Sequence, residues 1–178
     1  MFKLETDSLI LRDMSIEDEC AFVAISQDAK YQRFYDESDC EPDKYRELTQ
    51  LFVAQALEVP RQSFQLAVES KDSGKFIGTV CLRLEGNLQA SMGCAFSREI
   101  QGKGLSIEAA EALANFGFSE LGVQRIYAET ISKNLAAIKL CQSLGMKEEA
   151  RFEDHRFFKG KWWDTVRLEV VRSDWKKA

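Results

Sequence analysis

The sequence is poor in metal-binding residues and in excess basic charge. It has one histidine, His155, in 178 residues, and its five cysteines form no CxxC pair. Because recognisable zinc sites need closely spaced cysteine and histidine ligands, we expect no metal. Lysine and arginine number 24 against 29 aspartates and glutamates, a net charge of −5. Since nucleic-acid binding requires clustered cations, this balance argues against a direct nucleic-acid partner.

Long apolar runs are also missing. No stretch approaches the roughly 18 apolar residues of a membrane helix, and no basic and apolar signal segment opens the chain. We therefore expect no membrane association. An odd number of scattered cysteines is typical of reduced thiols, which predicts a cytoplasmic protein. The length and a hydrophobic content of 45% suit one domain spanning residues 1–178.

A glycine loop between an apolar strand and an amphipathic helix is the most informative feature present. Gly102 and Gly104 stand one residue apart where the helix begins. Glycine permits a tight turn there, and the first N–H groups of a helix lack intrahelical partners. Together with the helix dipole, such groups bind phosphate. A strand-to-helix turn without a ligand gives the same pattern, so both interpretations stay open.

Periodicity and turn residues predict an α/β fold. The expected elements are a strand at 9–12, a helix from a capping box at Ser15 to about 28, a loop at 30–41, a helix from Pro42 to Pro60, strands at 64–68, 76–84 and 91–96, a helix at 104–121, a strand at 125–130, a helix from Asn134 to Gly145, and a final hairpin. Leu105, Ala109, Ala112, Leu113 and Phe116 form the stripe expected to face the sheet. The strands flanking the helix at 104–121 should lie parallel in a right-handed crossover.

Two motifs carry a resemblance to a known family. Gln101-Gly-Lys-Gly-Leu-Ser106 resembles the [QR]-x-x-G-x-[GA] pyrophosphate loop of the GNAT superfamily of N-acyltransferases, with Ser106 where the family has glycine or alanine. Asn134 to Met146 is similar to the second motif of that family, with Met146 in place of the usual phenylalanine. A late pattern of Arg151, Gly160, Asp164 and Trp175 resembles the branch that acetylates ribosomal-protein N-termini.

The resemblance implies a GNAT-like fold and acetyl-CoA as co-substrate. Its mixed, mostly antiparallel sheet would be flanked by helices and splayed at a central parallel pair, after the strand that ends near Phe96. Acetyl-CoA would lie in the gap, with its pyrophosphate on the loop and its pantetheine arm near Asn134. The implied cofactor-binding residues are Cys94, Ala95, Phe96, Gln101, Gly102, Lys103, Gly104, Leu105, Ser106 and Asn134. In the family, N–H groups of the strand also stabilise the tetrahedral oxyanion.

The catalytic groups that the resemblance leads one to expect are absent. Cys141 stands where many relatives place a tyrosine that protonates the thiolate. Relatives that act on protein N-termini use a serine and a glutamate, and the matching residues are Ala137 and Arg156. Cys141 as proton donor and Glu129 as base are the remaining catalytic candidates, although packing and an exposed strand carboxylate explain them as well. His155, the only histidine, is a further candidate base because histidine often serves in that role, but it has no visible partner.

Acetyl transfer to a protein or peptide N-terminal α-amine, by direct attack in a ternary complex, is the predicted activity. An α-amine loses its proton at neutral pH far more easily than a lysine, which suits an enzyme without an obvious base. A small-molecule amine, such as a polyamine or an antibiotic, is an alternative acceptor, and a non-catalytic acyl-CoA-binding protein is another alternative. The sequence does not fix the acyl-chain preference or the choice between monomer and homodimer.

Overall fold

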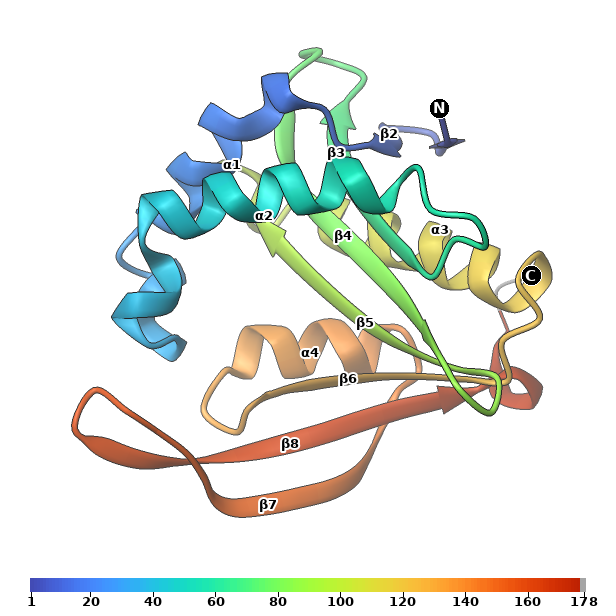
Figure 1. Cartoon of the computed structure of the whole chain (residues 1–178). Helices are drawn as coiled ribbons and strands as arrows, with labels where there is room; N and C mark the ends of the chain where they lie inside the picture. The colour runs from blue at the N-terminus through green and yellow to red at the C-terminus, as the bar shows by residue number, and fades with distance from the viewer. Residues whose placement is uncertain (177–178) are drawn as a thin grey trace.

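The computed structural model describes residues 1–176, which form one eight-stranded sheet with helices on both faces (Figure 1). The strand order is β1-β2-β3-β4-β5-β6-β8-β7, and every neighbouring pair is antiparallel except β5 and β6. The strands are β1 (Lys3–Glu5), β2 (Leu9–Asp13), β3 (Ser63–Ser70), β4 (Phe76–Glu85), β5 (Gln89–Phe96), β6 (Arg125–Ile131), β7 (Lys147–Phe158) and β8 (Lys161–Val171). The predicted mixed, mostly antiparallel α/β sheet is confirmed.

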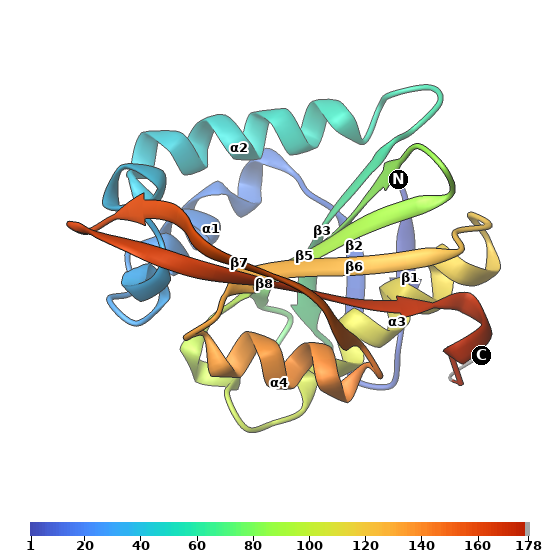
Figure 2. The ribbon, with the colours of Figure 1, turned by 90° about the horizontal axis from the view of Figure 1, so that it is seen from below.

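Two pairs of helices enclose the sheet, one pair on each face (Figure 2). The helices are α1 (Glu19–Ser26), α2 (Pro42–Gln55), α3 (Leu105–Ser119) and α4 (Leu135–Ser143). The larger core lies on the α3 and α4 face and includes Leu66, Leu82, Leu113 and Ile126. The smaller core lies under α1 and α2 and is built on Phe22 and Tyr45. No helix within residues 1–176 is long and apolar enough to cross a membrane.

The N-terminal part differs from the prediction in three places. The edge strand β1 was not predicted, because three residues carry too little periodicity and their pairing with β2 is a tertiary contact. The predicted loop at 30–41 contains two 3-10 turns, η2 (Tyr31–Phe34) and η3 (Glu37–Cys40). Helix α2 ends at Gln55 rather than at Pro60. Leu57 and Val59 are exposed, so no packing holds a further helical turn.

Helix α3 packs on the sheet through a face rich in small residues. Its buried face consists of Ala109, Ala110, Leu113, Ala114, Gly117 and Phe118. A Cβ at Gly117 would lie 2.8 Å from Leu82 Cδ2, so a larger residue there would require the Leu82 side chain to move. The predicted stripe does face the core: Ala109 and Leu113 are buried in it, and Leu105, Ala112 and Phe116 are partly buried and pack against it. Small residues, which a hydrophobicity pattern undervalues, make the contact.

The sheet opens at its parallel pair, as predicted. Strand β5 pairs with β6 only from Gln89 to Ser91, although β5 continues to Phe96. Beyond Ser91 the two strands diverge (Figure 1). The far edge of β5 is therefore left without a strand partner over its last five residues, Met92 to Phe96. This splay, together with the loop that follows it, positions the site described below.

Candidate active site

A cavity of about 1140 Å³ lies where the splayed end of β5 meets the turns after α1 and the starts of α3 and α4. It brings together residues that are far apart in the chain. Six of the predicted cofactor-binding residues line it: Cys94, Ala95, Phe96, Gln101, Ser106 and Asn134. The structure thus assembles most of the predicted binding residues around one space large enough for an extended ligand and an acceptor.

The glycine loop at one end of this cavity has the geometry of an anion receptor. Gly104 is the residue before α3, and its φ of 72° lies in the left-handed region that favours glycine. No side chain caps the helix, and a Cβ at Gly102 or Gly104 would meet no protein atom within 4 Å. The free first-turn N–H groups of α3 and the open space above the glycines fit a pyrophosphate.

The unpaired edge of β5 forms the cavity wall beside this loop. Its backbone N–H groups that face the gap are free to bind a ligand's carbonyl oxygens, because β6 has turned away. The Cys94 side chain is exposed to the cavity, and protein atoms surround it on its other sides. The resulting desolvation raises the pKa of Cys94. Cys94 therefore stays a neutral thiol at physiological pH.

Asn134 holds the start of α4 against the cavity. Its side-chain oxygen accepts a hydrogen bond from Ala137 N at 3.3 Å, which confirms the predicted helix cap. Its Nδ2 donates to Thr130 Oγ1 at 3.2 Å. The amide is thereby fixed between β6 and α4 at the cavity surface. A contact between Asn134 and the pantetheine arm stays a prediction.

Neither predicted catalytic residue lines the cavity. Glu129 is exposed on β6, where Arg167 Nη2 donates to its Oε2 at 3.1 Å. Cys141 is buried in the core beneath α4, and desolvation raises its pKa to about 11. Its thiol is thus a weak acid enclosed by apolar side chains. The catalytic roles of Glu129 and Cys141 stay predictions.

His155 and Trp163, in the late hairpin, make contacts within that hairpin and with the turn after α1. His155 Nδ1 lies 2.8 Å from Thr165 Oγ1, and its ring stacks on Phe152. The Trp163 ring stacks on Phe158 at 4.9 Å, and its Nε1 donates to Phe158 O. Phe34 meets Trp163 edge-on at 6.0 Å, which joins the hairpin to the turn after α1. Trp163 therefore packs within the protein.

Sequence reasoning only partly identified the opposite wall of the cavity. Tyr31, Phe34 and Tyr35 line it from η2 and the residue that follows, within the segment predicted as a loop. The Tyr31 and Tyr35 rings stack at 5.0 Å, and the Tyr31 and Tyr45 hydroxyl oxygens are 2.7 Å apart. The aromatic residues were visible in the sequence, but their direction depends on contacts with distant α2 and β8.

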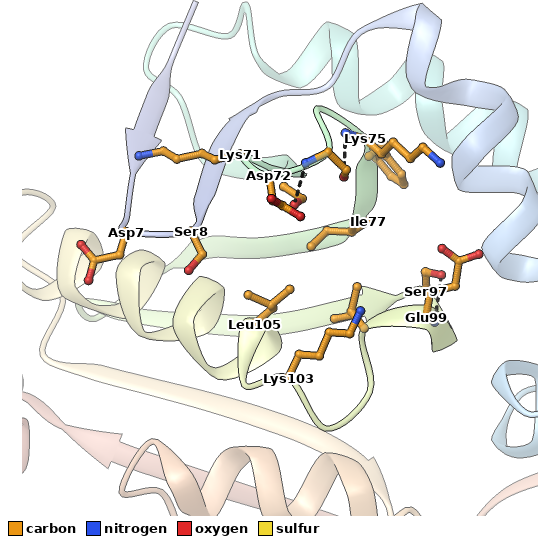
Figure 3. A pocket seen from close by; sticks show the side chains of 14 residues that line it. Asp7, Ser8, Lys71, Asp72, Lys75, Ile77, Ser97, Glu99, Lys103 and Leu105 are labelled. Atoms are coloured by element: carbon orange, nitrogen blue, oxygen red, sulfur yellow. Dashed lines mark hydrogen bonds between the residues drawn. The ribbon is translucent and has the colours of Figure 1, made fainter.

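A second, smaller pocket of about 580 Å³ lies on the other side of the glycine loop (Figure 3). Lys103 and Leu105, which were predicted to bind the cofactor, line this pocket rather than the large cavity. Lys71 extends from the facing turn toward β1, where it contacts Glu5 and Thr6. Within residues 1–176, no group of three or more His, Cys, Asp or Glu side chains is arranged to hold a metal ion.

The protein is thus of an α/β class in which a split sheet and an uncapped helix start border one cavity. The model of the Acetyltransferase (GNAT) domain matches residues 8–147, and the chain belongs to this family of acetyl-CoA-dependent N-acetyltransferases. The chain is 28% identical over 180 residues to the N-acetyltransferase p20 of Bacillus licheniformis, with 98% of this chain and 99% of that protein covered.

Solved structures from two functional groups share the fold. The ribosomal-protein-S5-alanine acetyltransferase of Vibrio fischeri aligns with a TM-score of 0.81 at 20% identity, covering 99% of this chain and 100% of that one. The spermidine N-acetyltransferase of Vibrio cholerae, solved with CoA and spermine, aligns with a TM-score of 0.80 at 22% identity, covering 95% and 98%. At these identities the likeness is one of fold, and it leaves the acceptor undetermined.

Proposed function

We propose that the protein transfers the acetyl group of acetyl-CoA directly to the α-amine of a peptide or protein N-terminus, within a ternary complex. Residues 1–178 would act as one catalytic domain. Strands β7 and β8 lie almost wholly beyond the matched family region, yet they complete the sheet and pack against the cavity wall. The charge of the cavity is the observation that favours this acceptor.

The charged residues that line the cavity disfavour a polyamine. Four are cations, Lys30, Arg33, Lys75 and Arg98, and two are carboxylates, Asp28 and Glu99. Asp28 accepts hydrogen bonds from the N–H groups of Lys30 and Tyr31 and lies 3.6 Å from Arg98. A polyamine carries several ammonium groups and would meet a wall with little free negative charge. A peptide N-terminus brings only one amine.

The chemistry of the amine supports the same choice. At pH 7, deprotonating a lysine with a pKa near 10.4 costs roughly 4.6 kcal/mol, whereas an α-amine near 7.8 costs about 1.1 kcal/mol. The cavity lining offers no histidine, and its carboxylates Asp28 and Glu99 have ordinary functions as ion-pair and turn residues. An enzyme of this kind can use an amine that loses its proton at so small a cost.

The co-substrate would be held by the loop from Gln101 to Ser106 and by the free edge of β5. The N–H groups at the start of α3 would bind its pyrophosphate, and alternate N–H groups along Cys94, Ala95 and Phe96, those not directed at β4, would bind the pantetheine arm and polarise the thioester carbonyl. Asn134 would contact the same arm from the start of α4. Bound acetyl-CoA supplies an activated acyl group and a thiolate leaving group.

Matched acceptors test the proposal. Three acceptors are compared at neutral pH: a peptide with a free N-terminus and no lysine, the same peptide acetylated at its N-terminus and containing one lysine, and spermidine. We expect kcat/KM to be highest for the free N-terminus. Faster acetylation of the lysine peptide or of spermidine would contradict the proposed acceptor, and no turnover with any amine would contradict the proposed activity.

Other features of the assignment stay predictions. The cytoplasmic location is predicted from five cysteines that are all free in the structure. A monomer and a homodimer are both compatible with the fold. We retain Glu129 and Cys141 as predicted catalytic residues; substitution of Glu129 by Gln tests the first, with an expected loss of kcat if it acts as a base.

A further inference from the structure

The wall of the cavity opposite β5 carries two cations that the activity described above leaves without a role. The glycine loop and the free edge of β5 are assigned to acetyl-CoA, so the lining that comes from α1 and the turn after it is left for the acceptor. Lys30 and Arg33 belong to this part of the lining, and both are exposed. Within residues 1–176, neither side chain forms an ion pair with a carboxylate. Their charges are therefore available to a bound molecule.

The segment that carries these cations is acidic in sequence, but the structure separates its charges. Four of its carboxylates lie outside the cavity lining: Asp36, Glu37, Asp39 and Glu41. Asp36 accepts a hydrogen bond from Ser38 N at 3.0 Å, and Asp39 lies 2.5 Å from Lys44 at the start of α2. The remaining carboxylate, Asp28, lines the cavity but is paired with Arg98. The segment thus presents its unpaired positive charges to the cavity and directs most of its acids elsewhere.

Contacts with the hairpin of β7 and β8 hold the turn that carries Arg33. The Arg33 guanidinium lies over the Phe34 ring, 5.1 Å from its centre. Phe34 in turn meets Trp163 of the hairpin edge-on at 6.0 Å, and Lys159 Nζ donates to Gln32 O. The cation is therefore placed by packed neighbours before any acceptor binds, which lowers the cost of ordering it on binding.

We infer that the preferred acceptor is a peptide N-terminus followed by acidic residues, whose carboxylates pair with Lys30 and Arg33 while the α-amine reaches the thioester on β5. This inference rests on the proposed transfer to an α-amine and names the class of peptide. Consecutive residues of an extended peptide are about 3.3 Å apart. The second and third residues therefore stay within roughly 7 Å of the amine, and a cavity of about 1140 Å³ holds them together with it.

The chemistry of the two cations suits this class of acceptor. A guanidinium binds a carboxylate through two parallel hydrogen bonds, and an ammonium adds a point charge beside it. The protein as a whole has a net charge of −5, which by itself repels an acidic peptide. A preference for acidic peptides would therefore arise from the local cations against the field of the whole molecule.

Three peptides with the same first residue and an amidated C-terminus test the inference. Their second and third residues are two aspartates, two asparagines or two arginines. In the wild type we expect kcat/KM to be about tenfold higher for the aspartate peptide than for the asparagine peptide, the effect of two ion pairs at an accessible site, and lowest for the arginine peptide. Nearby carboxylates raise the pKa of an α-amine and nearby guanidinium groups lower it, so ease of deprotonation alone would give the opposite order.

Salt and charge reversal identify the cause of the preference. Raising the ionic strength from 0.1 to 1 M shortens the screening length from about 10 to 3 Å and should reduce the preference to less than about threefold. Lys30→Gln combined with Arg33→Gln should abolish it. Lys30→Glu combined with Arg33→Glu should make the arginine peptide the best acceptor. Unchanged discrimination in the glutamate variant would overturn the inference.

A charge-matched control lies elsewhere on the molecule. Lys139→Glu combined with Lys147→Glu alters the net charge by the same amount at exposed positions that line neither pocket. This variant should keep the wild-type order of the three peptides. Loss of the aspartate preference in the control would assign the effect to the net charge and overturn the role of the two cavity cations.

Calorimetry with CoA distinguishes the acceptor from the phosphates of the co-substrate. The variant with glutamine at positions 30 and 33 should bind CoA within about twofold of the wild type. A tenfold weaker CoA affinity with unchanged peptide discrimination would assign the cations to CoA and overturn the inference. Equal rates with all three peptides in the wild type would also overturn it, but would leave transfer to an α-amine standing. Acetylation of none of them would overturn the proposed function and this inference with it.

Discussion

Gly104 has a left-handed backbone conformation, and the space that a Cβ would enter is empty. Substitutions can separate the effects of these two properties. Gly104→Val should lose about 1–2 kcal/mol of stability from the positive φ and should abolish CoA binding, because the branched side chain would fill the space above the loop. Gly122→Val is the matched control: its φ of 69° imposes the same strain, and a Cβ there also meets nothing, but it lies beyond the far end of α3.

Thermal denaturation and calorimetry with CoA check both variants. Gly122→Val should be destabilised to the same extent and should keep its CoA affinity. Unchanged CoA affinity in a folded Gly104→Val protein would mean that the pyrophosphate does not lie on this loop.

Asn134 offers a second test at the residue scale. Asn134→Ala should lose about 1 kcal/mol from the missing helix cap and should also bind CoA more weakly. Asn134→Asp keeps an oxygen for Ala137 N but loses the Nδ2 donor to Thr130. Urea denaturation and calorimetry distinguish the roles. A loss of stability in Asn134→Ala without any change in CoA affinity would leave Asn134 with a structural role only.

At the scale of elements, the hairpin of β7 and β8 supports the aromatic wall of the cavity. Trp163→Ala removes the ring that contacts Phe34 and Phe158 and should cost about 2 kcal/mol, less than for a fully buried ring. The KM for the acceptor should rise because η2 loses its support. Neighbouring Trp162 is 58% exposed, so Trp162→Ala should cost less than about 1 kcal/mol.

Chemical denaturation and acceptor kinetics measure these effects. Equal losses of stability from the two tryptophan variants would show that the contact between the hairpin and η2 contributes little. An unchanged acceptor KM in Trp163→Ala would separate the hairpin from the acceptor side of the cavity.

The elements that the sequence predicted well are those with local signals. The glycine turn before α3, the Asn134 cap and the crossover from β5 to β6 each depend on residues close together in the chain. The short strand β1 and the direction of Tyr31 depend instead on distant partners, β2 and Tyr45. A sequence reveals which aromatic residues a segment contains, but the surface on which they pack is set by tertiary contacts.

For the molecule as a whole, a partly buried ion pair predicts a loss of stability in acid. Burial would raise the pKa of Asp18, but hydrogen bonds from Arg12 and Ser15 and the charge of Arg12 outweigh it and lower that pKa. A carboxyl of this kind stabilises the fold above its unfolded pKa of about 3.9, and the contribution disappears as the pH falls through the lower folded value. We therefore expect the free energy of unfolding to decrease below about pH 4.

Asp18→Asn identifies the group. The variant should lose about 3 kcal/mol at neutral pH, because Arg12 loses a partner in a partly buried site, and its stability should fall less steeply in acid. Asp72→Asn, in the exposed turn between β3 and β4, should match the wild type. Urea titrations across pH 3 to 7 measure both; an equally steep acid loss in Asp18→Asn would assign the effect to other carboxyls.

The divergence of β5 from β6 also bears on how the sheet opens. In the sheet interior these two strands share the shortest ladder, from Gln89 to Ser91, so the hydrogen-bonded network is nearly divided between β1–β5 and β6–β8. Native-state amide exchange should therefore report two groups of protection rates that meet at this seam. An extended ligand arm along Met92 to Phe96 would supply the strand that is missing there. CoA should then slow amide exchange on both sides of the seam together. With the co-substrate bound, the two groups of strands would open as one cooperative unit.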